Sequence, residues 1–71
     1  MKYIRTNQNS IIIFSETLNH SDIRGFEGKP VSAGFVHLHD NELLVRGESF
    51  TLNLKSLPED KAIIARQLHL Y

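Results

Sequence analysis

The chain has 71 residues, with eight Lys and Arg residues against eight Asp and Glu residues, four His and no Cys. This length and composition predict one small, near-neutral globular domain over residues 1–71. The lack of cysteine excludes disulfide frameworks, thiol catalysis and cysteine-based metal sites, and it favours a reducing, cytoplasmic location. No apolar run approaches the roughly 18 residues of a membrane span, so we expect no membrane partner.

Residues 2–6 and 10–15 are predicted to form a hairpin of two strands, because the Asn-rich cluster at 7–9 is typical of a turn. Ile11 and Ile13 then point to one face of the second strand, and Ile12 and Phe14 point to the other. A strand that is apolar on both faces aggregates when it is left uncovered. We therefore expect the core to cover one side and a neighbour or a second chain to cover the other.

Residues 16–30 form the only long connection of the predicted fold. Within it, the run from Ser21 to Gly25 is predicted to be one helical turn that Gly25 closes. Ile23 and Phe26 are interpreted as the side chains that anchor this loop.

Residues 31–55 predict a three-stranded antiparallel meander. A two-residue turn at Asp40–Asn41 sets three pairs opposite each other: Leu38 with Leu43, His37 with Leu44, and Val36 with Val45. A second turn at Gly47–Glu48 pairs Val45 with Phe50 and Leu43 with Leu52. One face of the meander is then wholly apolar, consisting of Val36, Leu38, Leu43, Val45, Phe50, Leu52 and Leu54.

A helix is predicted after Ser56, because Ser56 and Glu59 have the spacing of a capping box and Pro58 suits the first turn. Its apolar stripe, assigned to the apolar face of the meander, consists of Leu57, Ile64, Leu68 and Tyr71. Ile63 and Leu70 lie about 100° away from this stripe. They form either the edge of a wide buried face or a second contact surface toward another subunit.

The predicted fold class is α+β: a small antiparallel sheet of about five strands with one C-terminal helix packed on it. The sheet consists of the N-terminal hairpin and the three-stranded meander. A curled, barrel-like sheet is the alternative.

The second face of the meander mixes aromatic, aliphatic and titratable side chains. Its members Phe35, Leu44 and Arg46, together with Ile63 and Leu70 of the helix, form the predicted interaction surface. Cover by the chain's own loop at 16–30 is the alternative to cover by a partner.

His37 and His39 have the spacing that places two imidazoles on one side of a strand, about 7 Å apart. In the predicted register Glu42 lies opposite His39, so these three residues form a candidate site for a divalent metal such as zinc. His20 or a residue of another chain would supply a fourth ligand. A structural or surface role for both histidines is the alternative.

The function that these features favour is a small non-enzymatic interaction or accessory module that associates with itself, as a homodimer, or with a protein partner. No nucleophile elbow, phosphate-binding glycine loop or zinc-protease motif occurs, so we expect no enzyme and no cofactor. Balanced, dispersed charge argues against nucleic acid as a partner. The alternatives are a metal-binding protein and a weak nucleic-acid module that uses Phe35, Arg46 and Lys55.

Overall fold

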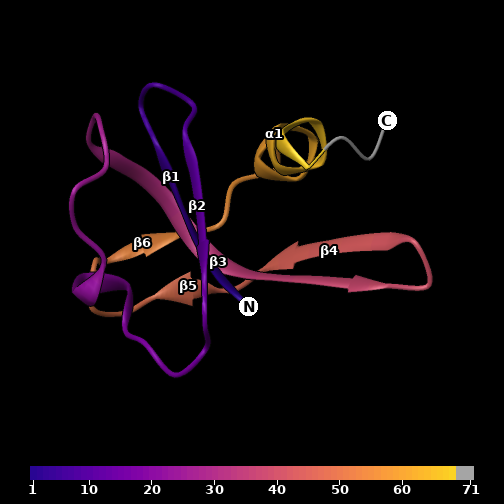
Figure 1. The fold of residues 1–71 in the computed structure, drawn as a ribbon, viewed down its shortest axis with the longest axis horizontal. Helices are drawn as coiled ribbons and strands as arrows, with labels where there is room; N and C mark the ends of the chain where they lie inside the picture. The colour runs from indigo at the N-terminus through magenta and orange to yellow at the C-terminus, as the bar shows by residue number, and fades with distance from the viewer. Residues whose placement is uncertain (69–71) are drawn as a thin grey trace.

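The computed structural model describes residues 1–68, which form an α+β fold (Figure 1). Four strands form one antiparallel sheet in the order β2-β1-β3-β4: β1 (Lys2–Thr6), β2 (Ile11–Phe14), β3 (Pro30–His39) and β4 (Glu42–Arg46). A second sheet pairs β5 (Glu48–Ser49) with β6 (Leu54–Lys55), and the helix α1 spans Asp60–Gln67. The predicted α+β class with a C-terminal helix is confirmed. The described residues form no closed barrel.

The N-terminal hairpin is confirmed, with Ile4 opposite Ile12 and Tyr3 opposite Ile13. Its turn includes Asn9, whose φ of 59° is the left-handed conformation that Asn tolerates. β1 pairs with β3 on its other side, so that Tyr3 lies opposite Gly34 and Arg5 opposite Ser32. Strand β1 is therefore interior to the sheet, and β2 lies at its edge.

The register of the β3–β4 hairpin is confirmed for all three predicted pairs: Val36 with Val45, His37 with Leu44, and Leu38 with Leu43. Asp40 and Asn41 both have positive φ, 50° and 66°. Two left-handed residues in succession give the tight turn whose twist matches that of paired strands, and Asp and Asn adopt this conformation more readily than most residues.

The predicted third strand of the meander is wrong. Glu48–Ser49 pairs with Leu54–Lys55 and not with β4, so the chain reverses over residues 50–53. Gly47, with φ of 90°, ends β4, and its carbonyl accepts a hydrogen bond from the Ser56 N–H. A second left-handed residue, Asn53, completes the later turn. The predicted apolar face is divided as a result, because Phe50 is 85% exposed and Leu38 is 52% exposed.

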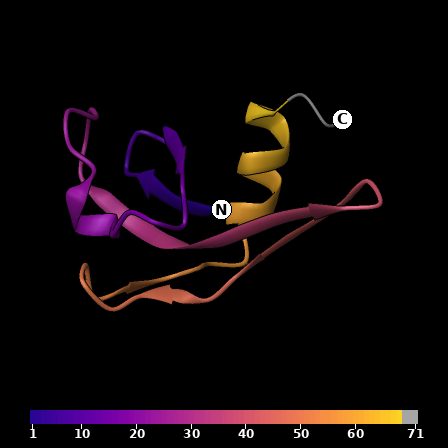
Figure 2. The same ribbon diagram turned by 60° about the horizontal axis from the view of Figure 1, so that its bottom comes forward.

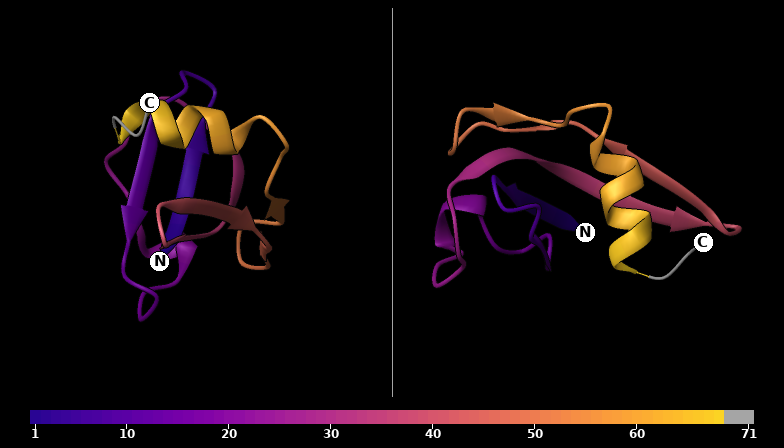
Figure 3. Two further views of the ribbon diagram at one scale, coloured as in Figure 1. Left: turned by 90° about the vertical axis from the view of Figure 1, so that its right-hand side faces the viewer. Right: turned by 90° about the horizontal axis from the view of Figure 1, so that it is seen from above.

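The hydrophobic core lies between the sheet and α1. Its buried members are Tyr3, Val36, Leu43, Ile64 and Ala65, with Ile11, Ile13 and Val45 packed against them. The β1–β2 and β5–β6 hairpins lie on opposite sides of β3, and α1 lies on the same side as β1–β2 (Figures 2 and 3). Within residues 1–68, no helix has the length and apolar character that crossing a bilayer requires.

The helix prediction is correct for Ile64, which is fully buried, and wrong for Leu68, which is 41% exposed. Tyr71 lies outside the described residues. The helix begins at Asp60, four residues after Ser56, and no side-chain hydrogen bond caps it at Glu59. Instead the Asp60 carboxylate accepts the Leu57 N–H, at 2.9 Å, while the Asp60 N–H donates to the Leu57 carbonyl. The capping role predicted for Ser56 therefore belongs to this reciprocal pair.

The helical turn in the long connection is the 3₁₀ turn η1 (His20–Asp22), which ends before Gly25. The residue after η1, Ile23, is extended, so Gly25 does not close the turn as predicted. Gly25 is left-handed, with a φ of 83°, but it lies outside this turn.

Candidate functional site

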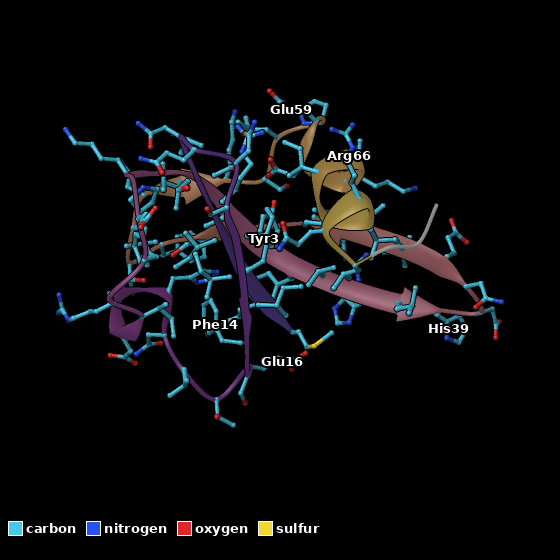
Figure 4. The ribbon with its side chains drawn as sticks, turned by 45° about the horizontal axis from the view of Figure 1, so that its top comes forward. Tyr3, Phe14, Glu16, His39, Glu59 and Arg66 are labelled. Carbon is cyan, nitrogen blue, oxygen red and sulfur yellow. The ribbon has the colours of Figure 1, made fainter. Side chains whose placement is uncertain are left out.

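A buried polar cluster joins the start of α1 to β1 and β3. The carboxylate of Asp60 accepts hydrogen bonds from the Tyr3 hydroxyl and from the Ser32 hydroxyl, the latter at 2.9 Å. Nη1 of Arg5 lies 3.3 Å from Oδ1 of Asp60. Tyr3 and Arg5 are two residues apart on β1 and so share a face, and Ser32 is the register partner of Arg5 on β3. Figure 4 shows Tyr3 at this contact between the sheet and the helix.

This cluster holds the helix on the sheet and offers no place for a substrate. Tyr3, Ser32 and Asp60 have no exposed surface. Burial raises the pKa of the Tyr3 hydroxyl, and the hydrogen bond to Asp60 raises it further, so Tyr3 stays protonated and serves as a donor. Nε of Arg5 is buried without a hydrogen-bond partner. The cost of burying the guanidinium charge is therefore offset by the ion pair with Asp60.

Two aromatic rings and His20 form one of the contacts that hold the long connection on the sheet. The His20 ring packs edge-on against Phe14 and Phe35, at centroid distances of 5.3 and 6.0 Å, and its Nε2 lies 3.1 Å from the Gly34 carbonyl oxygen. Burial lowers the pKa of His20, so the neutral ring is favoured. The chain's own loop thus covers Phe35, as the alternative prediction required.

The outer edge of β2 is the most unusual exposed feature of the sheet. Its four residues, Ile11 to Phe14, are partly buried, and none of them is charged, Pro or Gly. No strand of the described chain lies beyond β2 (Figure 3, left). Proteins commonly protect sheet edges with charges, proline, bulges, a covering segment or a short edge strand, and of these devices β2 has its length of 4 residues. This edge therefore has the properties of a surface that pairs with another strand.

The hydrogen-bonding direction of β2 follows from the bonds at both ends of β1. The Thr6 N–H donates to the Ser10 carbonyl, and the Val36 N–H donates to the Met1 carbonyl. Because bonding directions alternate along an antiparallel strand, even-numbered residues of β1 bond toward β2 and odd-numbered ones toward β3. The register partners of Lys2 and Ile4 are Phe14 and Ile12. The backbone groups of Ile11 and Ile13 therefore point outward from the sheet edge.

The residues of the predicted metal site lie at the end of the β3–β4 hairpin. Glu42 is opposite His39, as predicted, and His37 is on the same strand two residues earlier. All three side chains are exposed, and Figure 4 shows His39 near the tip of the hairpin. Nε2 of His39 lies 3.2 Å from Oδ2 of Asp40. Within residues 1–68, no three His, Asp or Glu side chains are grouped closely enough to hold a metal ion, and the metal site stays a prediction.

The predicted interaction residues lie in different environments and do not form one patch. Leu44 and Arg46 are exposed on β4, whereas Phe35 is partly buried against His20. Ile63 is partly buried on α1 and lines a shallow hollow with Asn9, Arg66 and Gln67. Leu70 lies outside the described residues. The interaction role of this set stays a prediction, as does nucleic-acid binding through Phe35, Arg46 and Lys55.

The sequence alone did not indicate the buried cluster around Asp60. The alternation of Tyr3 and Arg5 on β1 was the available signal, since it places a charge beside an aromatic ring on one face. Asp60 could be joined to them only through contacts between distant parts of the chain.

Comparison of the chain with protein-family models, with curated proteins and with solved structures finds no match in any of the three.

Proposed function

We propose that this protein is a small non-enzymatic interaction module that associates with a second copy of itself. The observation that supports this function is the outer edge of β2, which is apolar and has no charged residue, proline or glycine. Its residues are aliphatic or aromatic on both faces, and the backbone groups of Ile11 and Ile13 lack a strand to pair with among residues 1–68. Adding a strand to such an edge satisfies these groups and covers the side chains.

The small core supports the same proposal. A domain of this size hides only about 60% of the surface of its unfolded chain, so its stability is marginal without further burial. The chain has no cysteine to supply a disulfide. Association with a second copy is one of the usual ways in which so small a domain gains stability.

The test is sedimentation velocity over a wide range of protein concentration, combined with native mass spectrometry. We expect a dimer that dissociates on dilution, and a monomer for Ile12→Lys, which places a charge on the β2 edge. Leu44→Lys is the matched control, because Leu44 is an exposed apolar residue at the centre of the other edge strand. Circular dichroism confirms that each variant is folded.

A wild-type protein that stays monomeric at every concentration would overturn the proposal. The same mass spectra report bound metal. A stoichiometric zinc adduct that is lost in His37→Ala would favour the metal-binding hypothesis in its place.

A further inference from the structure

We infer that the two copies pair through β2 in one antiparallel register, with a twofold axis at Ile12, so that two four-stranded sheets become one continuous sheet. This inference rests on the proposed self-association and specifies its interface. With a twofold axis at the strand edge, the β2 edge of one copy contacts the β2 edge of the other, which is the symmetry of a closed dimer.

The register follows from the outward-pointing backbone groups. In an antiparallel pair, two residues that both point toward the partner strand exchange both of their hydrogen bonds. Within β2 the outward residues are Ile11 and Ile13. Only a twofold axis at Ile12 sets Ile11 opposite Ile13 of the partner subunit, and Ile13 opposite the partner's Ile11, so that both are used. An axis at Ile11 or at Ile13 would pair one of them with itself and the other with a residue outside β2, Asn9 or Ser15.

The side chains match in this register. Ile11 and Ile13 face the helix side of the sheet, where they already pack against the core cluster. Their cross-strand partners are isoleucines on the same face, a pairing of β-branched residues that stabilises sheets. On the opposite face, Ile12 meets Ile12 of the partner subunit. Because β2 has no charged residue, the pairing of the two β2 strands brings no like charges together.

The other edge of the sheet, β4, is protected by comparison. Its terminal residues are Glu42 and Arg46, both exposed, and the exposed His39 at the end of β3 and Asp40 in the turn lie beside them. Charged residues at an edge oppose strand addition because pairing would remove their hydration. The equivalent twofold pairing of β4 would be centred on Leu44, so a probe at Leu44 reports on that alternative.

Single cysteines test the register, because the natural chain has none. The Ile12 pair is of the kind without hydrogen bonds, whose Cα atoms lie about 4.5 Å apart, within the range that a disulfide spans. We expect Ile12→Cys to form a disulfide-linked dimer at least about tenfold faster than Leu44→Cys, since pairing raises the effective concentration of the two thiols. Both variants are oxidised mildly at the same concentration and followed on non-reducing gels.

A second experiment tests the register without the Ile12→Cys variant. Ile11→Cys and Ile13→Cys should each cross-link slowly alone and rapidly when mixed, because each faces the other across the axis. Faster cross-linking of Leu44→Cys, or failure of both the Ile12→Cys and the mixed reactions while sedimentation shows a dimer, overturns this register and leaves self-association standing. A monomer in sedimentation overturns both.

Discussion

Replacing Asp60 by Ala is expected to remove most of the stability of the domain. The substitution leaves Arg5 as a buried charge without its partner, which costs about 3–5 kcal/mol in comparable buried pairs. It also leaves the Tyr3 and Ser32 hydroxyls and the Leu57 N–H without their acceptor, at about 1–3 kcal/mol for each donor that stays buried and unpaired. These contributions overlap, so we expect a loss of at least about 4 kcal/mol in the free energy of unfolding.

A domain of this length has a total stability of only about 4–11 kcal/mol, so Asp60→Ala should be largely unfolded or close to it. Urea titration followed by far-UV circular dichroism measures the loss. Glu59→Ala is the matched control, since Glu59 is an exposed carboxylate next in the chain, and its change should stay within about 0.5 kcal/mol. Arg66→Ala, on the outer side of the helix, gives a second exposed control (Figure 4).

A loss below about 1 kcal/mol for Asp60→Ala would refute the reasoning, because it would mean that the buried donors find water or other acceptors. The conservative variant Asp60→Asn separates charge from shape. It keeps the side-chain volume and one oxygen acceptor but removes the negative charge opposite Arg5. We expect it to retain part of the stability that Asp60→Ala loses.

Two further predictions concern other contacts of the fold. Burial lowers the pKa of His20 in the folded state, so the unfolded chain binds the proton more readily. The free energy of unfolding should therefore fall as the pH decreases from the usual histidine pKa of about 6.5 toward the lower pKa of the folded state. Urea midpoints at pH 7.5 and 5.5 should therefore differ more for the wild type than for His20→Gln, and an equal difference would contradict this role of His20. Gly34→Ala should destabilise by about 1–3 kcal/mol, because a Cβ at this position would lie 2.7 Å from the Arg46 carbonyl oxygen. An unchanged urea midpoint for Gly34→Ala would show that β3 and β4 can separate there at no cost.

Contacts between neighbouring parts of the chain were predictable from the sequence. The turn at Asp40–Asn41 has residues suited to left-handed conformations, and only one register aligns Val36, Leu38, Leu43 and Val45 on one face. The same logic failed seven residues later, where Gly47 suggested a turn between paired strands. Its left-handed backbone instead directs the chain away from β4, and the β5 strand that follows pairs with β6, next to the hydrogen bond from Ser56 to Gly47. Apolar alternation alone does not distinguish a third strand from a separate hairpin.

The polar cluster was not predictable because its members come from three distant segments. Asp60 near the C-terminus meets Tyr3 and Ser32 only after β1 has paired with β3 and α1 has packed on the sheet. For the β2 edge, the sequence showed that the strand was apolar on both faces. That it lies at the margin of the sheet depends on the insertion of β1 between β2 and β3, a topology with no local signal.

The long strand β3 has a mechanical consequence for the molecule. Its first half is held by β1 and its second half by β4, and the two pairings overlap at Phe35. The β1–β2 hairpin is thus attached to the first half of β3, and β4 is attached to its second half. A rotation of the β1–β2 hairpin relative to β4 must therefore bend β3 near Phe35. Helix α1 contacts both β2 and β4, and so it restrains the rotation of these two parts of the sheet relative to each other. The Asp60 carboxylate joins the first turn of this helix to β1 and β3, so the position of α1 on the sheet depends on one buried side chain.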